Sequence, residues 1–333
     1  MIDLKRDNEV VAKRPSTEDA LRAIRDIRDA PESFDLKRDL APFLLHKSNH
    51  VAAAAADSVG RLEAVTLAQN LADAFLEWMK NPAERDPGCK ALTAIAKTLA
   101  AMDHPASAAY LAGVRHVQME ASFGPKVDAA AALRGLCAQG LARMSHPDAL
   151  LECVTLLADS EVAARTGAAR AISESGQHAG VLLLRYKALI GDKDEEVIAE
   201  CFAGLLRLAP PESLEFVATF LQSSEEIAER AALALGESHL AAAFPLLQEA
   251  WHATSQATLR RTLLLAMAVL RLDEAVEFLL ARLAEDGEKS ALGALAALAL
   301  YGRDEVVRSR IQEILAKRKS AALGNLFNQE FGQ

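Results

Sequence analysis

Apolar residues recur three and four positions apart along most of this chain, and short polar stretches separate these segments. The segment from Pro147 to Gly176 is the clearest example. Pro147 suits the first turn of a helix, a polar turn follows at residues 159–161, and an Ala-rich helix is expected from Val162 to Ser175. Gly176 then ends that helix by offering a left-handed cap. On the first helix, the stripe expected to be buried consists of Leu150, Leu151, Val154, Leu156 and Leu157.

The same pattern returns further along the chain. Residues 171–183 align without gaps on residues 234–246, an offset of 63 residues, and a third helix pair fits between them. The elementary period of about 32 residues is typical of stacked helical repeats, and we predict about eight helix pairs. A lead-in helix is expected at Thr17–Asp29 and a last helix at Asp304–Lys317. The pairs expected upstream of Pro147 are Phe34–His46 with His50–Leu62, Leu62–Lys80 with Cys89–Met102, and Pro105–Val117 with Asp128–Met144.

These pairs predict an all-α fold, an α-α superhelix of the right-handed solenoid type. Residues 1–15 are polar and charged, and we expect a disordered N-terminal tail there. The solenoid with its lead-in helix is expected to occupy residues 16–320. Residues 321–333 are expected to form a C-terminal tail or a cap that seals the last pair, with a docking motif for another protein as the alternative.

Composition and charge narrow the picture further. The chain is 51% hydrophobic, 25% charged and only 5% aromatic, which favours closely packed helices. Its net charge of -9 argues against an extended phosphate-binding surface, so we do not expect it to bind nucleic acid. The start carries no apolar secretory signal, and the longest apolar run, Ala291–Tyr301, is too short to span a bilayer. A cytoplasmic protein without a membrane span is expected.

Two helix pairs share a motif in which a turn Asp precedes an Arg six residues later and small residues follow on the second helix. In one pair it consists of Asp159, Val162, Arg165, Ala168, Ala169, Ala171 and Ile172, and in the other of Asp128, Arg134, Cys137, Ala138 and Leu141. With this motif, the chain resembles HEAT-repeat proteins, including the bacterial HEAT-like type related to bilin lyases, over about residues 33–301. The resemblance implies a structural ladder in which Asp128 bonds Arg134 and Asp159 bonds Arg165. Glu200 takes the place of the Arg after Asp194, and Arg230 follows Ser224, so the ladder is expected only in the middle pairs.

Residues 81–128 depart most from the repeat. The first irregular stretch, residues 81–90, contains two prolines and feeds a helix, so Gly88 and Lys90 are candidates for holding an anion; a plain connector is the alternative. The second stretch, residues 113–120, gathers Arg115, His116 and Gln118 next to an insertion at residues 123–126. Such loops on a rigid scaffold often carry recognition, although Arg115 and His116 also suit a helix C-terminus.

No motif for catalysis, metal binding or a cofactor is found in the sequence. The four cysteines stand singly and are expected to be small buried residues, and Trp78 and Trp251 are expected either in the core or exposed on the outer face. His46 and His50 are four apart, but a turn separates their helices, which argues against a shared metal. We therefore expect no catalytic residues, no metal and no cofactor.

The sequence thus predicts a non-enzymatic scaffold or adaptor that binds a protein or peptide partner along the inner face of the repeats. A subunit of a HEAT-like chromophore lyase and a nucleic-acid-binding protein are the alternatives. The identity of the partner and the oligomeric state stay open. The candidate contact residues are Lys90, Arg115, His116, Gln118, Arg134, Glu200, Arg230 and Arg261.

Overall fold

A computed structural model describes residues 16–332, and the chain divides into two compact units, Met1–His146 and Pro147–Gln333. Each unit is described by itself. The tail expected at residues 1–15 lies outside the described residues.

The N-terminal unit is built from helices and one short hairpin. Ser16 caps the first helix, because its hydroxyl accepts a hydrogen bond from the Asp19 backbone N–H. The elements are α1 (Thr17–Asp29), η1 (Pro31–Ser33), α2 (Leu36–Asp39), η2 (Ala41–Leu45), α3 (Asn49–Arg61), η3 (Val65–Leu67), α4 (Ala68–Trp78), α5 (Pro82–Arg85), η4 (Pro87–Cys89), α6 (Lys90–Ala101), α7 (Ser107–Val114), β1 (Met119–Glu120), β2 (Val127–Asp128) and α8 (Ala131–Arg143).

Helices α3, α6 and α8 pack side by side as one layer of this unit, and α4 and α7 cover them. Two of the predicted helices differ in extent from the observed ones. Residues 34–46 form α2 and the 3-10 helix η2 rather than one helix, and Asp128 lies on strand β2 instead of starting α8. Pro42 explains the first difference. It has no backbone N–H to donate, so the helix that begins before it cannot continue through this position, and η2 starts at Ala41 instead.

The C-terminal unit consists of successive helix pairs. They are α9 (Ala149–Leu157) with α10 (Val162–Glu174), α11 (Ala179–Ile190) with α12 (Glu195–Leu208), α13 (Pro210–Ala218) and η5 (Thr219–Gln222) with α14 (Glu225–Glu237), α15 (Ala243–Ala253) with α16 (Ala257–Val269), α17 (Asp273–Glu285) with α18 (Glu288–Leu298) and η6 (Ala299–Tyr301), and α19 (Glu305–Arg318) with α20 (Ala321–Phe331).

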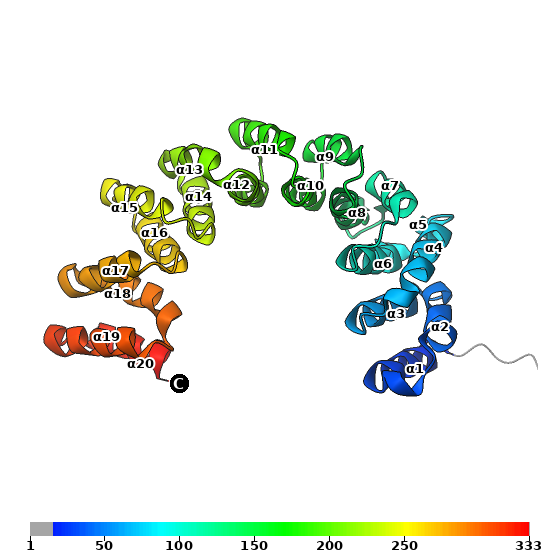
Figure 1. The fold of residues 1–333 in the computed structure, drawn as a ribbon, viewed down its shortest axis with the longest axis horizontal. Helices are drawn as coiled ribbons and strands as arrows, with labels where there is room; N and C mark the ends of the chain where they lie inside the picture. Colours follow the sequence, from blue (N-terminus) through cyan, green and yellow to red (C-terminus); the bar gives the residue numbers. More distant parts are fainter. Residues whose placement is uncertain (1–15, 333) are drawn as a thin grey trace, which may run out of the picture. The chain divides into compact units, whose positions relative to one another are not determined.

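The second helices of these pairs form a layer of their own. Helix α10 packs on α12, α12 on α14, α14 on α16, α16 on α18 and α18 on α20, as the order of the helices within this unit shows (Figure 1). Each helix leans on its neighbours in the layer, so the core continues from pair to pair. The predicted all-α fold of stacked helix pairs is confirmed. Gly176 has φ +66°, the left-handed conformation expected where α10 stops.

The second-helix layers are closely packed because small residues line them. The backbone of Gly236 on α14 lies so near α16 that an added Cβ would lie 2.5 Å from the carbonyl oxygen of Ala266. In the N-terminal unit, the ring of Tyr110 occupies the space beside Gly140 of α8. All four cysteines are buried, in agreement with the sequence-based expectation. Trp78 and Trp251 are buried too, which decides between the core and outer-face positions that the sequence left open. Burial raises the pKa of the Cys153 and Cys201 thiols to about 12.

One expected core stripe is wrong. On α9, Leu156 and Leu157 are buried, but Leu151 is 67% exposed and Val154 is exposed too. The face of α9 that packs inward instead carries Ala149 and Cys153, because small side chains let α9 lie close to α10. An exposed apolar strip results, and it continues on the neighbouring helix α11 through Leu182, Tyr186, Leu189 and Ile190.

The end of the chain adds a final helix to the second-helix layer. Ser320 caps α20 by accepting a hydrogen bond from the Leu323 backbone N–H, and Leu323 and Phe331 are buried. The domain boundaries at residues 16–320 and 321–333 stay predictions.

Candidate functional site

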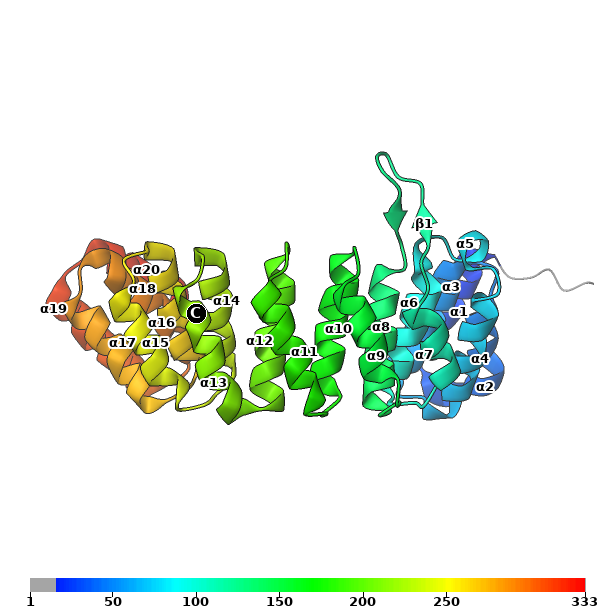
Figure 2. The same cartoon turned by 90° about the horizontal axis from the view of Figure 1, so that it is seen from above.

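A hairpin projects from the N-terminal unit between α7 and α8 (Figure 2). Strands β1 and β2 are antiparallel, with Met119 opposite Asp128 and Glu120 opposite Val127. The connecting loop is held by Ser122, whose hydroxyl donates to the carbonyl oxygen of Pro125 at 2.7 Å. Figure 2 shows the hairpin extending beyond the ends of the helices of this unit.

Large apolar side chains on this hairpin face solvent. Phe123 in the loop is fully exposed, and Val117, Met119 and Val127 are each more than half exposed. A lone exposed apolar residue is ordinary, but four on one small projection are a feature of interaction sites. Aromatic residues and Met are enriched in protein–protein interfaces.

The base of the hairpin is a buried polar network centred on Asp128. Its carboxylate accepts hydrogen bonds from the backbone N–H groups of Gln118 and Ala130, both at 3.0 Å, and from Arg134 Nη1 at 2.6 Å. Arg134 Nη1 also donates to the carbonyl oxygen of His116. Burial raises the pKa of Asp128, but these hydrogen bonds and the charge of Arg134 lower it by more, so the net shift is downward and the carboxylate is charged.

The irregular connection at residues 81–90 is tied to the same hairpin. Asp86 is fully buried, and its carboxylate accepts hydrogen bonds from the backbone N–H groups of Ala91 and Leu92 at the start of α6. The Gln118 side-chain amide donates to the carbonyl oxygen of Asp86, and the Gly88 backbone N–H donates to Glu120 at 2.7 Å. Connection and hairpin therefore support each other.

These contacts correct the anion-site hypothesis for Gly88 and Lys90. The N–H groups of Gly88, Ala91 and Leu92, which an anion would need, already donate to the carboxylates of Glu120 and Asp86. Lys90 Nζ lies 3.3 Å from His50 Nε2. The stretch is a connector, and the carboxylates of Glu120 and Asp86 hold it in place.

The structure gathers five of the candidate contact residues around this hairpin, in two different roles. Arg115 and Lys90 are exposed and His116 is half-buried. Gln118 is 3% and Arg134 is 2% exposed, so a contact role for these two is wrong: they hold the hairpin in place. The polar side chains of Gln118 and Arg134 suggested recognition, because the positions of residues along a sequence do not show which of them are buried.

Sequence reasoning missed the exposed apolar residues of the hairpin and the carboxylate of Asp86. A usable signal existed for the first. Val117 and Met119 alternate with polar residues, and Gly124-Pro125 follows within a few positions, a pattern typical of a strand and turn. The role of Asp86 has no such signal, because its partners lie on α3, α6 and the hairpin.

In the C-terminal unit, Arg165 is the centre of a second buried network. Its Nε and Nη2 donate to the two carboxylate oxygens of Asp192 at 2.8 Å, and Nη2 also reaches Asp194. The predicted partner Asp159 contributes its main-chain carbonyl, which accepts from Arg165 Nη1. Lys187 adds a second ion pair to Asp192 at 2.8 Å. Burial raises the pKa of Asp192, but the hydrogen bonds from Arg165 and Lys187 outweigh it and bring the pKa to about 2.

The remaining candidate residues lie in the second-helix layer. Glu200 of α12 accepts a hydrogen bond from Arg170 of α10, and Arg230 of α14 lies 3.7 Å from Glu195 of α12. These pairs link consecutive helices and use charges that were expected to serve a partner. Arg261 of α16 differs from them, since it forms no ion pair within residues 16–332.

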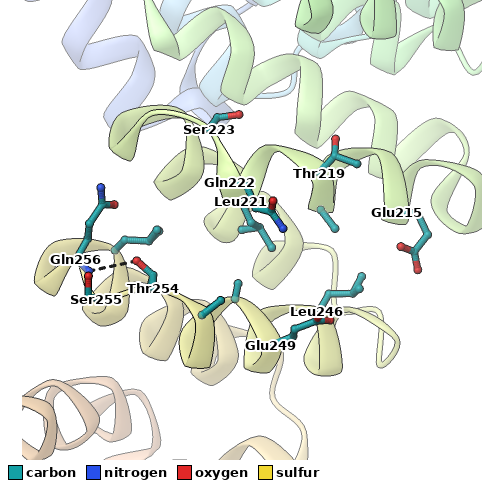
Figure 3. A pocket seen from close by; sticks show the side chains of 14 residues that line it. Glu215, Thr219, Leu221, Gln222, Ser223, Leu246, Glu249, Thr254, Ser255 and Gln256 are labelled. Atoms are coloured by element: carbon teal, nitrogen blue, oxygen red, sulfur yellow. Dashed lines mark hydrogen bonds between the residues drawn. The ribbon is translucent and has the colours of Figure 1, made fainter.

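A pocket of about 530 Å³ lies between the pair that begins with α13 and the pair that begins with α15 (Figure 3). Carboxylates of Glu215 and Glu249 and several hydroxyl and amide groups line it, and Gln256 donates its backbone N–H to Thr254 Oγ1. Among the described lining residues there is no cation, His or Cys. The pocket is a gap between two adjacent helix pairs, and its described lining does not bring reactive side chains together.

Within residues 16–332, no group of three or more His, Cys, Asp or Glu side chains is arranged to hold a metal ion. The helices described in this range include none of the length and apolarity that crossing a bilayer requires.

The comparisons with known proteins give fold-level likenesses only. No family model matches the chain, and no curated protein matches it in sequence. Among solved structures, the complex of CpcE and CpcF of phycocyanin lyase from Nostoc sp. PCC7120 aligns with 94% of this chain and 100% of its own, at 14% identity and a TM-score of 0.34. An engineered protein aligns with 95% of this chain and 94% of its own, at 16% identity and a TM-score of 0.40.

The expectation of a non-enzymatic chain is contradicted by the first of these likenesses and is not retained. That solved structure is of a phycocyanin lyase, which is an enzyme. A TM-score of 0.34 assigns no lyase chemistry to this chain.

Proposed function

We propose that this chain is a helical-repeat scaffold that binds a protein partner, with the hairpin of residues 117–128 as a principal contact. The observation that carries the proposal is the exposure of Phe123, Met119, Val117 and Val127 on one projecting element. When a partner removes apolar surface of this kind from water, the complex is stabilised by roughly 25 cal/mol per Å² of buried area.

The buried base supports this proposal. Arg134, Gln118 and Asp86 fix both strands to α6 and α8, so the hairpin is held before a partner arrives. A preorganised element loses less conformational entropy on binding than a flexible loop. Arg115 and His116 lie beside the base and supply polar contacts at the edge of such an interface.

Binding along the second-helix layer, as the sequence suggests, is the other part of the proposal. Within that layer, Glu200 already pairs with Arg170 and Arg230 with Glu195. Arg261 is therefore the candidate contact residue that is left there. A cytoplasmic location stays a prediction.

The test compares the double change Phe123→Ser and Met119→Ser with wild type and with Leu45→Ser, a control at another exposed apolar position of the same unit. Each tagged protein is used to capture partners from native lysate, followed by quantitative mass spectrometry and by titration with the purified partner. We expect the hairpin variant to lose a partner that wild type and control retain, about tenfold or more in affinity, which corresponds to 1.4 kcal/mol. Melting temperatures should agree among the three proteins, because the altered side chains are exposed.

Identical captured proteins and affinities for all three would exclude the hairpin as a contact. A bilin chromophore that co-purifies with the chain, or activity that requires a second subunit, would instead favour the chromophore-lyase alternative.

A further inference from the structure

We propose that a groove between α16, α18 and α20 of the C-terminal unit binds an acidic amphipathic peptide segment of a protein partner. The groove has a volume of about 730 Å³. It lies in a different unit from the hairpin, and its test does not depend on the hairpin.

The floor of the groove is apolar and comes from all three helices. Leu264 belongs to α16, Leu292 and Ala296 to α18, and Leu326 to α20. Gly293 leaves bare backbone in the floor: a Cβ there would lie 3.3 Å from Leu264 and 3.4 Å from the Arg261 side chain. The absence of a side chain at this position therefore contributes to the depth of the groove.

Three cations line the groove, and none of the described lining residues is acidic. They are Arg260 and Arg261 of α16 and Lys289 of α18. Arg260 is held in place by stacking, since its guanidinium carbon lies 4.1 Å from the centre of the Trp251 ring. In a chain with a net charge of -9, this cluster has the opposite sign to the whole.

The acidic residues nearest Lys289 in sequence, Asp286 and Glu288, do not line this groove; together with Arg260 and Lys289 they line a neighbouring hollow. Asp286 accepts from Arg282 at 2.9 Å and from the Ser290 hydroxyl at 2.6 Å, and Glu288 accepts from the Ser320 hydroxyl at 2.6 Å. Within residues 16–332, no ion pair neutralises Arg260, Arg261 or Lys289. Carboxylates on an occupant would complement their charge.

The dimensions favour a helical peptide. From Ala257 to Leu264, the wall formed by α16 spans eight residues, about 10 Å or two helical turns. Two turns of an amphipathic helix present apolar side chains at i, i+3, i+4 and i+7 to such a floor. The cations stand on two different helices, so they match several carboxylates along a peptide better than the single headgroup of a fatty acid.

The test measures fluorescence polarisation of a labelled helical peptide with Leu at i, i+3, i+4 and i+7 and Glu at its remaining positions. A matched peptide carries Lys in place of every Glu. We expect the full chain to bind the Glu peptide at least about tenfold more tightly than the Lys peptide. The double change Arg261→Glu and Lys289→Glu should weaken the Glu peptide about tenfold or more and favour the Lys peptide.

The control double change, Arg303→Glu and Lys317→Glu, makes the same charge difference at exposed cations away from the groove and should leave both affinities within about twofold. A third variant, Ala296→Trp, fills the groove without altering charge and should also weaken the Glu peptide. All altered side chains are exposed, so circular dichroism and melting should match wild type.

Equal affinities for the two peptides, or equal losses in the groove and control variants, would overturn the proposal. So would binding of laurate to the groove without binding of the Glu peptide, which would assign the groove to a small anionic amphiphile. The hairpin variant Phe123→Ser/Met119→Ser should bind the Glu peptide as wild type does, so a failure at the groove leaves the hairpin proposal intact.

Discussion

At the scale of single residues, buried polar groups hold the irregular segments of this chain in place. Asp128 and Arg134 fix the hairpin, and Arg165 and Asp192 join the turns of two consecutive helix pairs. Each group is hydrogen-bonded on several sides, which offsets the cost of removing it from water. Sequence spacing pointed to both arginines and to Asp128 as the partner of Arg134, but not to Asp192 as the partner of Arg165 or to the burial of either arginine.

Asp192 gives the sharpest stability prediction. Its side chain is 2% exposed and pairs with Arg165 and Lys187, so Asp192→Asn should lower the free energy of unfolding by about 3 kcal/mol at pH 7. The pKa of Asp192 falls from an ordinary 3.8 to about 2 on folding, so its contribution is present above pH 3.8 and is lost as the pH falls through 2. The gap between variant and wild type should therefore close over that range, as measured by urea denaturation at a series of pH values.

The control is Glu196→Gln, whose side chain is 64% exposed and 3.9 Å from Arg170. We expect a loss under about 1 kcal/mol there, since water screens the pair. A pH-independent gap for Asp192→Asn would show that the ion pairs do not stabilise the fold.

At the scale of elements, the separation between second helices depends on missing side chains. Gly236 allows α14 to approach the backbone of α16, and small residues elsewhere in the layer serve the same purpose. The close approach explains why these helices are rich in Ala although Ala buries little surface. The space that larger side chains would fill is taken up by the neighbouring backbone.

Gly236→Ala tests this packing. The added Cβ would lie 2.5 Å from the carbonyl oxygen and 2.9 Å from the Cα of Ala266, and backbone atoms cannot turn aside as a side chain does. We expect a loss of about 1–3 kcal/mol in unfolding free energy. Gly324→Ala on α20 is the matched control, because nothing lies within 4 Å of its added Cβ and Ala favours the helix by about 0.5–1 kcal/mol. Urea midpoints that shift in the same direction for both would refute the close-approach explanation.

At the scale of the whole chain, the charge balance separates the remaining classes of partner. The net charge is -9, and the groove between α16, α18 and α20 contributes three cations, Arg260, Arg261 and Lys289. Three cations displace about three counterions from DNA, whereas specific DNA-binding proteins commonly neutralise six to ten phosphates.

We therefore predict no saturable binding to random DNA at physiological salt. The measurement is fluorescence polarisation of labelled DNA at about 50 and 200 mM salt, with a basic DNA-binding protein as positive control. Saturable binding that weakens steeply between the two salt concentrations would restore the nucleic-acid alternative.

Local periodicity determined the helix pairs of this protein. The apolar spacing, the stop at Gly176 and the single cysteines each depend on a few neighbouring residues, so the helices and much of the core follow from the sequence alone. The alternation of apolar and polar residues around Val117 and Met119 also indicates the hairpin, although a search for helical periodicity does not detect it.

Tertiary structure alone decided which side chains are free to meet a partner. Gln118 and Arg134 are polar yet buried, while Leu151 and Phe123 are apolar yet exposed, because burial depends on which helix packs over each position. The groove brings Arg261, Lys289 and Leu326 together from three helices. Contacts between residues so far apart in sequence leave no local pattern, and only the packed chain brings them to one surface.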